Sequence, residues 1–370
     1  MMETKKQTLE LYIHIPFCVH KCAYCDFLSA PAARETQEAY VECLLEEIRR
    51  SAKLSENYEV STVFFGGGTP SILKGEQIGR ILEQLKAQFS FEKSAEITLE
   101  ANPGTVHRDK LRTYKDAGVN RLSFGLQSSE DTELRLLSRI HTWQQFVESY
   151  TLAREAGFEN INIDLMSALP GQTKESYQKT LDRVVRLRPE HISAYSLIIE
   201  EGTPFYERYA GNPELLPSEE EERGMYVLTK EILESGGYRR YEISNYAKKG
   251  YECRHNLGYW ERTDYKGYGL GAASLLHDIR FTNHTDLSEY LSGNFAGSEE
   301  KLTSRAIREE YFFLGLRKTE GVDPGMYRRY YEKLIKKLKT QELLGEKNGK
   351  IYLTERGIDV SNYVLAQFLD

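Results

Sequence analysis

The stretch LELYIHIPFCVHKCAYC, Leu9 to Cys25, joins an apolar, strand-like run to three closely spaced cysteines. Cys18, Cys22 and Cys25 have the spacing C-x3-C-x2-C. Three thiolates at this spacing can point at one centre from a single loop. The sequence therefore predicts a metal site on the loop that directly follows the first strand.

Apolar, strand-like runs alternate with amphipathic segments through the first 200 residues. The runs are Leu11–Ile15, Val60–Phe65, Ile97–Glu100, Arg121–Phe124, Ile161–Leu165 and Ile192–Leu197. The segments between them are Gln37–Ala52, Glu76–Gln88, Arg108–Ala117, Trp143–Ala156 and Lys174–Leu187. This pattern predicts an α/β fold with a parallel sheet and helices outside it. Six units favour a partial (β/α)6 barrel, because a complete barrel needs eight.

Glycine, asparagine and proline punctuate the predicted strand ends. They occur in GGGTP (Gly66–Pro70), ANPG (Ala101–Gly104), LPGQT (Leu169–Thr173) and EEGTP (Glu200–Pro204). In α/β barrels the loops after the strands form the functional face. We therefore expect these loops and the cysteine loop to share one rim.

Composition excludes several classes of protein. The 370 residues are 40% hydrophobic and carry a net charge of −7, which disfavours nucleic-acid binding through bulk basicity. No apolar run is long enough for a membrane span, and the polar N-terminus lacks the apolar core of a signal peptide. The cysteines number five, which is an odd and small number, and this argues against a disulfide scaffold. We expect a cytoplasmic protein.

The pattern changes after about Gly211. A helix is predicted over Ser218–Glu234, and a segment rich in glycine and tyrosine follows over Tyr251–Gly271. The end of the chain predicts a helix, a two-stranded turn at Asn348–Gly349 and another helix, similar to a small winged-helix domain. Because the whole chain has a net negative charge, this domain is not assigned to DNA binding. The predicted divisions are 1–210 for the barrel, 211–295 for a connecting segment and 296–370 for the mostly helical C-terminal domain.

The cysteine spacing alone leaves two metal sites open. The thiolates could hold Zn²⁺, with His14 or His20 as the fourth ligand. They could instead hold three irons of a [4Fe–4S] cluster and leave the fourth iron open to a substrate or cofactor. Cys43 lies on an amphipathic segment and is interpreted as part of the core.

The cysteine motif after the first strand closely resembles the signature of the radical S-adenosylmethionine (SAM) superfamily. The resemblance implies that the open iron binds the amino and carboxylate groups of SAM, and that the reduced cluster cleaves SAM homolytically. It also implies that residues at the strand ends contact SAM through its methionine, ribose and adenine. These residues are Tyr12, Tyr24, Gly67, Gly68, Thr69, Glu100, Gln127, Arg139 and Asp164.

Further strings are similar to one subgroup, the oxygen-independent coproporphyrinogen III oxidases and the HemW-type haem chaperones. They are YIHIPFC, GGGTPS, LEANPG, SFGLQS, RIHT, DLMSALPGQT and YSLIIEEGTP. The oxidases carry another cysteine two residues beyond the third ligand, where this chain has Phe27. They also have a longer N-terminal extension, whereas eleven residues precede Tyr12 here. Both differences favour the chaperone branch.

The segment CRHNLGYW, Cys253 to Trp260, matches the HNxxYW motif of that branch. The resemblance implies haem binding by His255, Tyr259 and Trp260, with Cys253 as an alternative iron ligand. A neutral imidazole suits haem iron, and aromatic side chains suit the face of a porphyrin. An alternative interpretation of His255 is a hydrogen-bonded side chain in the core.

The resemblance therefore implies a haem chaperone with a [4Fe–4S] cluster, SAM and haem as cargo. Acceptor haemoproteins of the respiratory chain would be its partners, with no nucleic acid. Membrane-bound acceptors would bring it to a membrane surface, and the cluster and SAM could support a homodimer or regulate transfer. The alternatives are coproporphyrinogen III oxidation, another radical SAM reaction on a tetrapyrrole, or a non-enzymatic zinc module. No catalytic residue is assigned.

Overall fold

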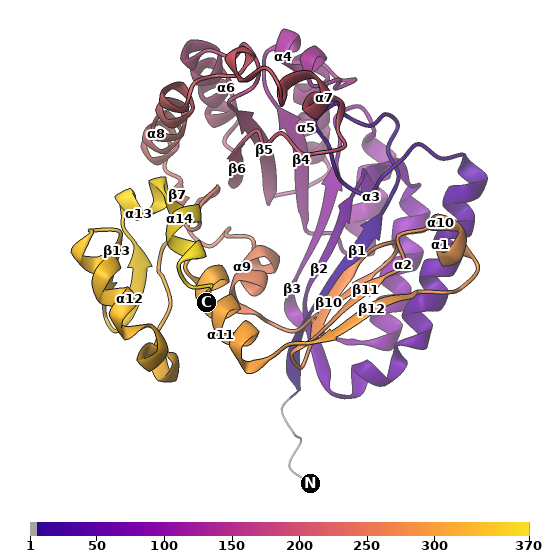
Figure 1. The fold of residues 1–370 in the computed structure, drawn as a ribbon. Helices are drawn as coiled ribbons and strands as arrows, with labels where there is room; N and C mark the ends of the chain where they lie inside the picture. Colours follow the sequence, from indigo (N-terminus) through magenta and orange to yellow (C-terminus); the bar gives the residue numbers. More distant parts are fainter. Residues whose placement is uncertain (1–5, 370) are drawn as a thin grey trace.

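The six predicted strand–helix units follow one another in a computed structural model that describes residues 6–369 (Figure 1). The strands are β1 (Gln7–Ile15), β2 (Tyr58–Gly67), β3 (Ser90–Ala101), β4 (Arg121–Gln127), β5 (Ile161–Ser167) and β6 (His191–Ser196). The helices between them are α1 (Arg34–Arg50), α2 (Gly75–Gln88), α3 (Arg108–Ala117), α4 (Asp131–Leu136), α5 (Trp143–Glu155) and α6 (Lys174–Leu187). The predicted α/β class and partial barrel are confirmed.

These strands lie side by side in sequence order and are parallel. A seventh parallel strand, β9 (Tyr265–Tyr268), pairs with β1. Strand β9 was not expected from the sequence, because its four residues, YKGY, contain no apolar run. Antiparallel strands then extend both edges of the sheet. They are β10 (Ala273–Leu276), β11 (Ile279–Asn283) and β12 (Ala296–Lys301) beside β9, and β8 (Asn245–Ala247) and β7 (Arg239–Arg240) beside β6.

Alternation along β1 separates the two faces of the sheet. Leu9, Leu11 and Ile13 are fully buried in the main hydrophobic core. Glu10, between Leu9 and Leu11, and His14, directly after Ile13, alternate with them and are also buried, so they share the inner face. The helices complete the outer core, and α1, α2 and α3 lie along the right side of the sheet in Figure 1. The barrel therefore has an apolar outer layer and a polar interior.

Loop residues at the strand ends also start the helices that follow. Thr173 ends LPGQT, and its side chain accepts a hydrogen bond from the backbone N–H of Ser176, which begins α6 with a capping box. Thr142 starts α5 in the same way. Such caps stabilise a helix by about 1 kcal/mol and fix where the preceding loop ends. The rim loops are thus held at both of their ends.

The predicted connecting segment contributes strands to the same sheet. It contains β7 to β11, with the helices α8 (Glu219–Ser235), α9 (Arg254–Glu261) and α10 (Leu287–Leu291). A short helix, α7 (Pro204–Tyr209), precedes it. Ser218 caps α8, in agreement with the predicted helix. The division at residues 210 and 295 stays a prediction, while the hydrogen-bonded sheet runs across both positions.

The C-terminal part forms the mostly helical unit that was predicted. Its elements are α11 (Ser304–Gly315), α12 (Arg328–Thr340), β13 (Leu344–Lys347), β14 (Lys350–Leu353), α13 (Glu355–Asp359) and α14 (Ser361–Ala366). Asn348 and Gly349 both have positive φ, 53° and 80°, as a tight hairpin turn requires. Phe312, Ile351 and Phe368 belong to a separate hydrophobic core. Among residues 6–369, no helix is both long and apolar enough to cross a bilayer.

Candidate functional site

A cavity of about 850 Å³ opens where the strand ends meet the cysteine loop. The lining residues include Cys18, His20, Lys21, Cys22, Tyr24, Cys25, Phe27, Gly67, Gly68, Thr69, Glu100, Asn102, Ser123, Gly125, Gln127, Arg139, Asp164 and Tyr195. The three cysteines and eight of the nine predicted SAM contacts therefore share one cavity. The ninth, Tyr12, is not in this lining, and its hydroxyl lies 3.0 Å from Nδ1 of His14.

Backbone hydrogen bonds form within the cysteine loop and between this loop and the chain that follows α4. The N–H of Cys25 donates to the carbonyl of Cys22 at 3.2 Å, and the N–H of Ala23 donates to the carbonyl of Leu137 at 3.2 Å. The thiols of the loop are a separate feature, and all five cysteines of the chain are free thiols.

Burial raises the pKa of the Cys25 thiol. Within residues 6–369, no three His, Cys, Asp or Glu side chains form a group that could hold a single metal ion.

Two side chains hydrogen-bond to cysteine sulfurs. The Thr69 hydroxyl donates to Sγ of Cys18 at 3.5 Å, and Nη1 of Arg139 donates to Sγ of Cys22 at 3.6 Å. Nδ2 of Asn102 donates to the Thr69 hydroxyl at 2.8 Å, and Oδ1 of Asn102 accepts from Nη2 of Arg139 at 2.7 Å. A single asparagine therefore links the two groups that contact sulfur.

The glycine run after β2 allows the backbone to approach the cysteine loop. A Cβ added at Gly68 would lie 2.7 Å from the Phe17 carbonyl oxygen and 3.0 Å from Sγ of Cys18. Gly67 has φ of +108°, which L side chains rarely adopt. The neighbouring N–H of Thr69 donates to the Phe17 carbonyl at 2.8 Å. These positions need glycine for close contact with the cysteine loop.

Two carboxyl groups line the cavity from β3 and β5. Burial, together with the charge of the neighbouring Asp164, raises the pKa of Glu100 to about 8. Burial also raises the pKa of Asp164, although its carboxylate accepts hydrogen bonds from Asn162 at 2.7 Å and Ser123 at 3.2 Å. A positively charged ligand in the cavity would favour the ionised forms of both groups.

Some polar atoms on the cavity wall have no protein partner. Oε1 of Gln127 and Nε of Arg139 are buried without a hydrogen bond. Gln127 also has φ of +73°, which is uncommon for a residue other than glycine. Because a buried polar group without a partner costs about 1–3 kcal/mol, such atoms in a cavity are candidates for ligand contact.

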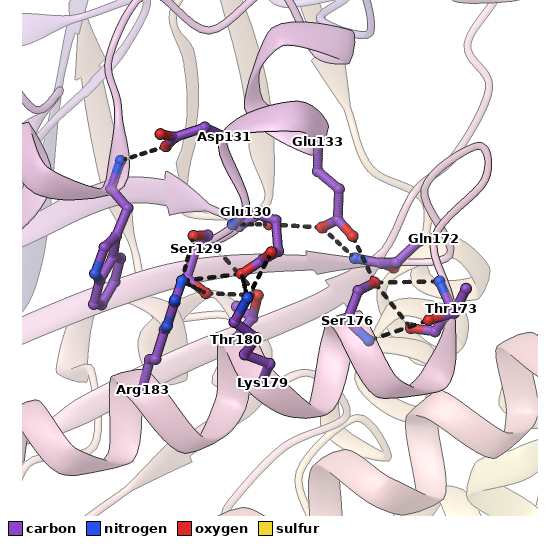
Figure 2. A network of polar contacts seen from close by, with 12 residues as sticks. Ser129, Glu130, Asp131, Glu133, Gln172, Thr173, Ser176, Lys179, Thr180 and Arg183 are labelled. Atoms are coloured by element: carbon purple, nitrogen blue, oxygen red, sulfur yellow. Dashed lines mark hydrogen bonds and ion pairs between the residues drawn. The ribbon is translucent and has the colours of Figure 1, made fainter.

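A polar network behind the rim positions the loops that follow β4 and β5 (Figure 2). The Glu133 carboxylate accepts hydrogen bonds from Gln172 at 3.0 Å and Ser176 at 2.6 Å, which ties α4 to the LPGQT loop. Arg183 on α6 donates to the Ser129 carbonyl at 2.8 Å and pairs with Glu130 at 2.9 Å. The network is structural, because its residues do not line the cavity.

The HNxxYW motif lies away from the rim, on α9. The His255 side chain is buried, with an exposed fraction of 1%. Its Nδ1 hydrogen-bonds to the Thr62 hydroxyl at 2.7 Å, and its Nε2 to the Tyr259 hydroxyl at 3.0 Å. Its ring stacks on Phe64 with centroids 5.0 Å apart. Burial lowers the pKa of His255 to about 3, so the imidazole is neutral.

In this arrangement, the side chains of the motif that could bind haem iron are buried and hydrogen-bonded. Both nitrogens of His255 are engaged, so iron ligation would require the ring to leave the interior. Cys253 is fully buried, its thiol donates to Glu96 at 3.6 Å, and burial raises its pKa to about 12. Trp260 packs its ring under the Arg317 guanidinium, 4.3 Å from the ring centroid. Haem binding by the motif stays a prediction.

Sequence patterns did not point to Asn102, Tyr195 or the polar interior below the rim. Asn102 belongs to ANPG, whose residue types indicate only a strand end, although it follows Glu100 by two residues. The interior carries Glu10, Glu96 and Arg121, all at most 7% exposed. Alternation of polar with apolar residues in LELYIHI was the available signal for this polar face.

Comparison with known proteins agrees with this geometry. The model of the radical SAM superfamily matches residues 12–184, and the model of the HemN C-terminal domain matches residues 302–360. Heme chaperone HemW of Lactococcus lactis is 37% identical, covering 97% of this chain and 96% of the relative. Heme chaperone HemW of Bacillus subtilis is 36% identical, covering 97% and 98%.

Among solved structures, coproporphyrinogen III oxidase (HemN) from Escherichia coli superposes with a TM-score of 0.85 at 26% identity. The match covers 98% of this chain and 90% of that one. HemN is described there as a radical SAM enzyme, in keeping with the fold and the position of the cysteine loop. With relatives above 30% identity over nearly the whole chain, the protein belongs to the HemW family of the radical SAM superfamily.

Proposed function

We propose that this protein is a haem chaperone that holds a [4Fe–4S] cluster on Cys18, Cys22 and Cys25, binds SAM beside it, and passes haem to acceptor haemoproteins. The observation that carries the cofactor part is the shared cavity of about 850 Å³. The cargo is inferred from the relatives, which are named heme chaperones.

The residues present fit an iron–sulfur cluster. The three thiols are free, lie on one loop and line one cavity. Thr69 and Arg139 donate hydrogen bonds to two of the sulfurs. Hydrogen bonds of this kind tune the potential of a cluster held by cysteine thiolates. Zinc is the alternative metal for the same ligands, and metal analysis separates the two.

The remaining wall fits SAM. The Arg139 guanidinium can pair with a carboxylate, and the backbone at Gly68 and Thr69 can approach an amino group closely. Glu100 and Asp164 can accept hydrogen bonds from ligand hydroxyl or amino groups. When bound and reduced, such a cluster supplies the electron for homolytic cleavage of SAM. The chain's own residues orient the ligand and hold it against the cysteine loop.

The finer parts of the proposal concern cellular context. We place the protein in the cytoplasm, with respiratory haemoproteins as acceptors, peripheral contact with the membrane that holds them, and a homodimer as its assembly. Composition supports the first, since the chain has no apolar run of membrane-span length. The respiratory acceptors, the membrane contact and the dimer follow from the family resemblance.

The second candidate function is oxygen-independent oxidation of coproporphyrinogen III. The structural similarity to HemN favours it. Against it, Phe27 lines the cavity at the position where the oxidases carry a further cysteine. The aromatic side chain puts an apolar surface in place of a thiol at this point of the wall.

Two assays on anaerobically reconstituted protein test these functions. The first titrates haem into the protein and follows transfer to the haem-free form of a respiratory haemoprotein. The second supplies coproporphyrinogen III, SAM and a reductant, with products followed by mass spectrometry. We expect haem binding and transfer and no decarboxylated product. Absence of haem binding would contradict the chaperone, and protoporphyrinogen IX would establish the oxidase.

A further inference from the structure

An imidazole can bind haem iron only through a ring nitrogen that is free and accessible. All eight histidines of the chain lie within residues 6–369. Three of them are buried with both ring nitrogens hydrogen-bonded: His14, His191 and His255. Three others each have a hydrogen bond on one ring nitrogen: His107, His277 and His284.

The last two histidines differ in exposure. His141 has an Nε2 without a partner, but this atom is enclosed and the residue is only 5% exposed. His20 is exposed, and neither of its nitrogens pairs with another residue in the described part of the chain. Among the described histidines, His20 is therefore the exposed one with both ring nitrogens unpaired, so an iron can reach it without a rearrangement of the protein. His107 is also exposed and keeps one nitrogen free, but the hollow that it lines is surrounded by charged side chains.

His20 also stands at the border of two hollows. It lines the large cavity beside Cys22 and Phe27. It also lines an adjoining cleft of about 320 Å³, which it shares with Val19 and Ile140. A flat ligand bound to His20 would thus lie over the mouth of the candidate cofactor cavity.

Three large apolar side chains around this mouth face solvent. The exposed fractions of Val19, Phe27 and Ile140 are 54%, 60% and 62%. We call these three residues the rim patch. They come from two separate loops that meet at the two hollows lined by His20. Exposed apolar groups gathered at a cavity mouth are typical of a surface that binds an apolar partner.

The chemistry around the rim patch favours haem as that partner. The macrocycle is flat and apolar, its iron takes an imidazole, and its propionates are anionic. The exposed Lys21 lies next to His20, and its ammonium group donates to the Phe27 carbonyl at 3.0 Å. A cation beside the rim patch can pair with a propionate.

We propose that haem docks on the rim patch, with His20 as an axial ligand of its iron and Val19, Phe27 and Ile140 against the macrocycle. This inference rests on the proposed haem binding and names its site. It places the cargo at the mouth of the SAM cavity, on the loop that carries the cluster ligands, instead of in the interior beside α9.

The test uses the full chain with its cluster reconstituted, so that Cys18, Cys22 and Cys25 are not free to bind haem. Haem is titrated into the wild type and into His20→Ala, and the axial ligand is identified by resonance Raman and electron paramagnetic resonance. We expect an affinity at least about tenfold weaker in His20→Ala and loss of the imidazole signature. Added imidazole should restore the signature. His107→Ala, which removes an exposed histidine elsewhere, should behave like the wild type.

A second variant keeps the test valid if His20→Ala disturbs the cluster. Ile140→Glu changes the rim patch from a different loop and should weaken haem binding by about tenfold without changing the axial ligand. The matched control is Val227→Glu, at an exposed apolar position on α8 that is 44% exposed. Iron and sulfide contents are measured for every variant.

The outcomes separate this inference from the proposed function. A wild type that binds no haem would overturn both. Haem binding with unchanged affinity and spectra in His20→Ala would overturn the His20 assignment and leave the chaperone standing. Loss of the imidazole signature in His255→Gln or His141→Ala, with His20→Ala unaffected, would move the site to that residue.

Discussion

Nδ1 of His255 lies 2.7 Å from the Thr62 hydroxyl, inside the barrel between α9 and β2. The same ring is hydrogen-bonded through Nε2 to Tyr259 and stacks on Phe64. The histidine of the string that resembles a haem motif is thus folded into the interior as a packed, neutral side chain. This relationship separates two roles for His255 that can be measured independently.

Thr62→Val should lower the free energy of unfolding by about 1–3 kcal/mol, because it leaves a buried imidazole nitrogen without a partner. Chemical denaturation measures this change. Thr151→Val, at an exposed position on α5, should change stability by no more than about 0.5 kcal/mol. Haem affinity should stay at the wild-type value. Tighter haem binding in Thr62→Val would show that His255 leaves the interior to bind iron.

Glu100 should make stability depend on pH. Its pKa is raised to about 8 in the folded protein, against an ordinary value of 4.5. The folded protein therefore keeps a proton that the unfolded chain has lost. The contribution of protonated Glu100 to the free energy of unfolding is complete below pH 4.5 and is lost as the pH rises toward 8. The free energy of unfolding then falls by at most about 1.4 kcal/mol per pH unit.

Glu100→Gln should remove this slope. Relative to the wild type, the variant should be more stable at pH 8 and similar near pH 4.5, as measured by denaturant unfolding at each pH. Its SAM affinity should fall, since the cavity loses a carboxylate. Glu83→Gln, on the exposed side of α2, is the control. Stability curves that run parallel for Glu100→Gln and the wild type would contradict the raised pKa.

Gly68→Ala should prevent assembly of the site. The added Cβ would lie 2.7 Å from the Phe17 carbonyl oxygen, so the backbone of the cysteine loop must move. We expect iron and sulfide contents after reconstitution to fall well below those of the wild type. Gly79→Ala is the matched control, because its Cβ meets nothing within 4 Å on a helix. It should stabilise the protein by about 0.5–1 kcal/mol and keep full iron content.

Cys18→Ser, Cys22→Ser and Cys25→Ser should each lose the cluster, because a serine hydroxyl does not replace a thiolate ligand. Iron and sulfide analysis and the visible absorption spectrum measure the loss. Cys43→Ser on α1 should keep both, since Cys43 is remote from the cavity lining. A colourless wild type with one zinc would show instead that the thiols form a zinc site.

The order of the parallel strands and the position of the cysteine loop could be predicted from the sequence. Periodicity along the chain is a local property, and six apolar runs separated by amphipathic segments leave few arrangements other than a parallel sheet. The loops after such strands meet at one rim, so Gly68, Glu100, Arg139 and Asp164 could be expected near the cysteines. The structure places them in one cavity.

Strand β9 could not be predicted, because four residues carry too little pattern and its pairing with β1 joins segments about 250 residues apart. The role of Asn102 could not be predicted from the sequence for a similar reason. Its hydrogen bonds reach Thr69 and Arg139, which lie far from it in the sequence. Such contacts depend on three-dimensional packing and leave no local signal.

The sequence by itself determined the α/β fold, the family and the spacing of three cysteines on one loop. Each of these depends on residue types and their spacing along the chain. Only the tertiary structure decided which histidine can reach a ligand. His20 and His255 are the same side chain in the sequence, but folding buries one between Thr62 and Tyr259 and leaves the other exposed at the cavity mouth. Burial and hydrogen bonding arise from distant segments brought together, and they set what each imidazole can bind.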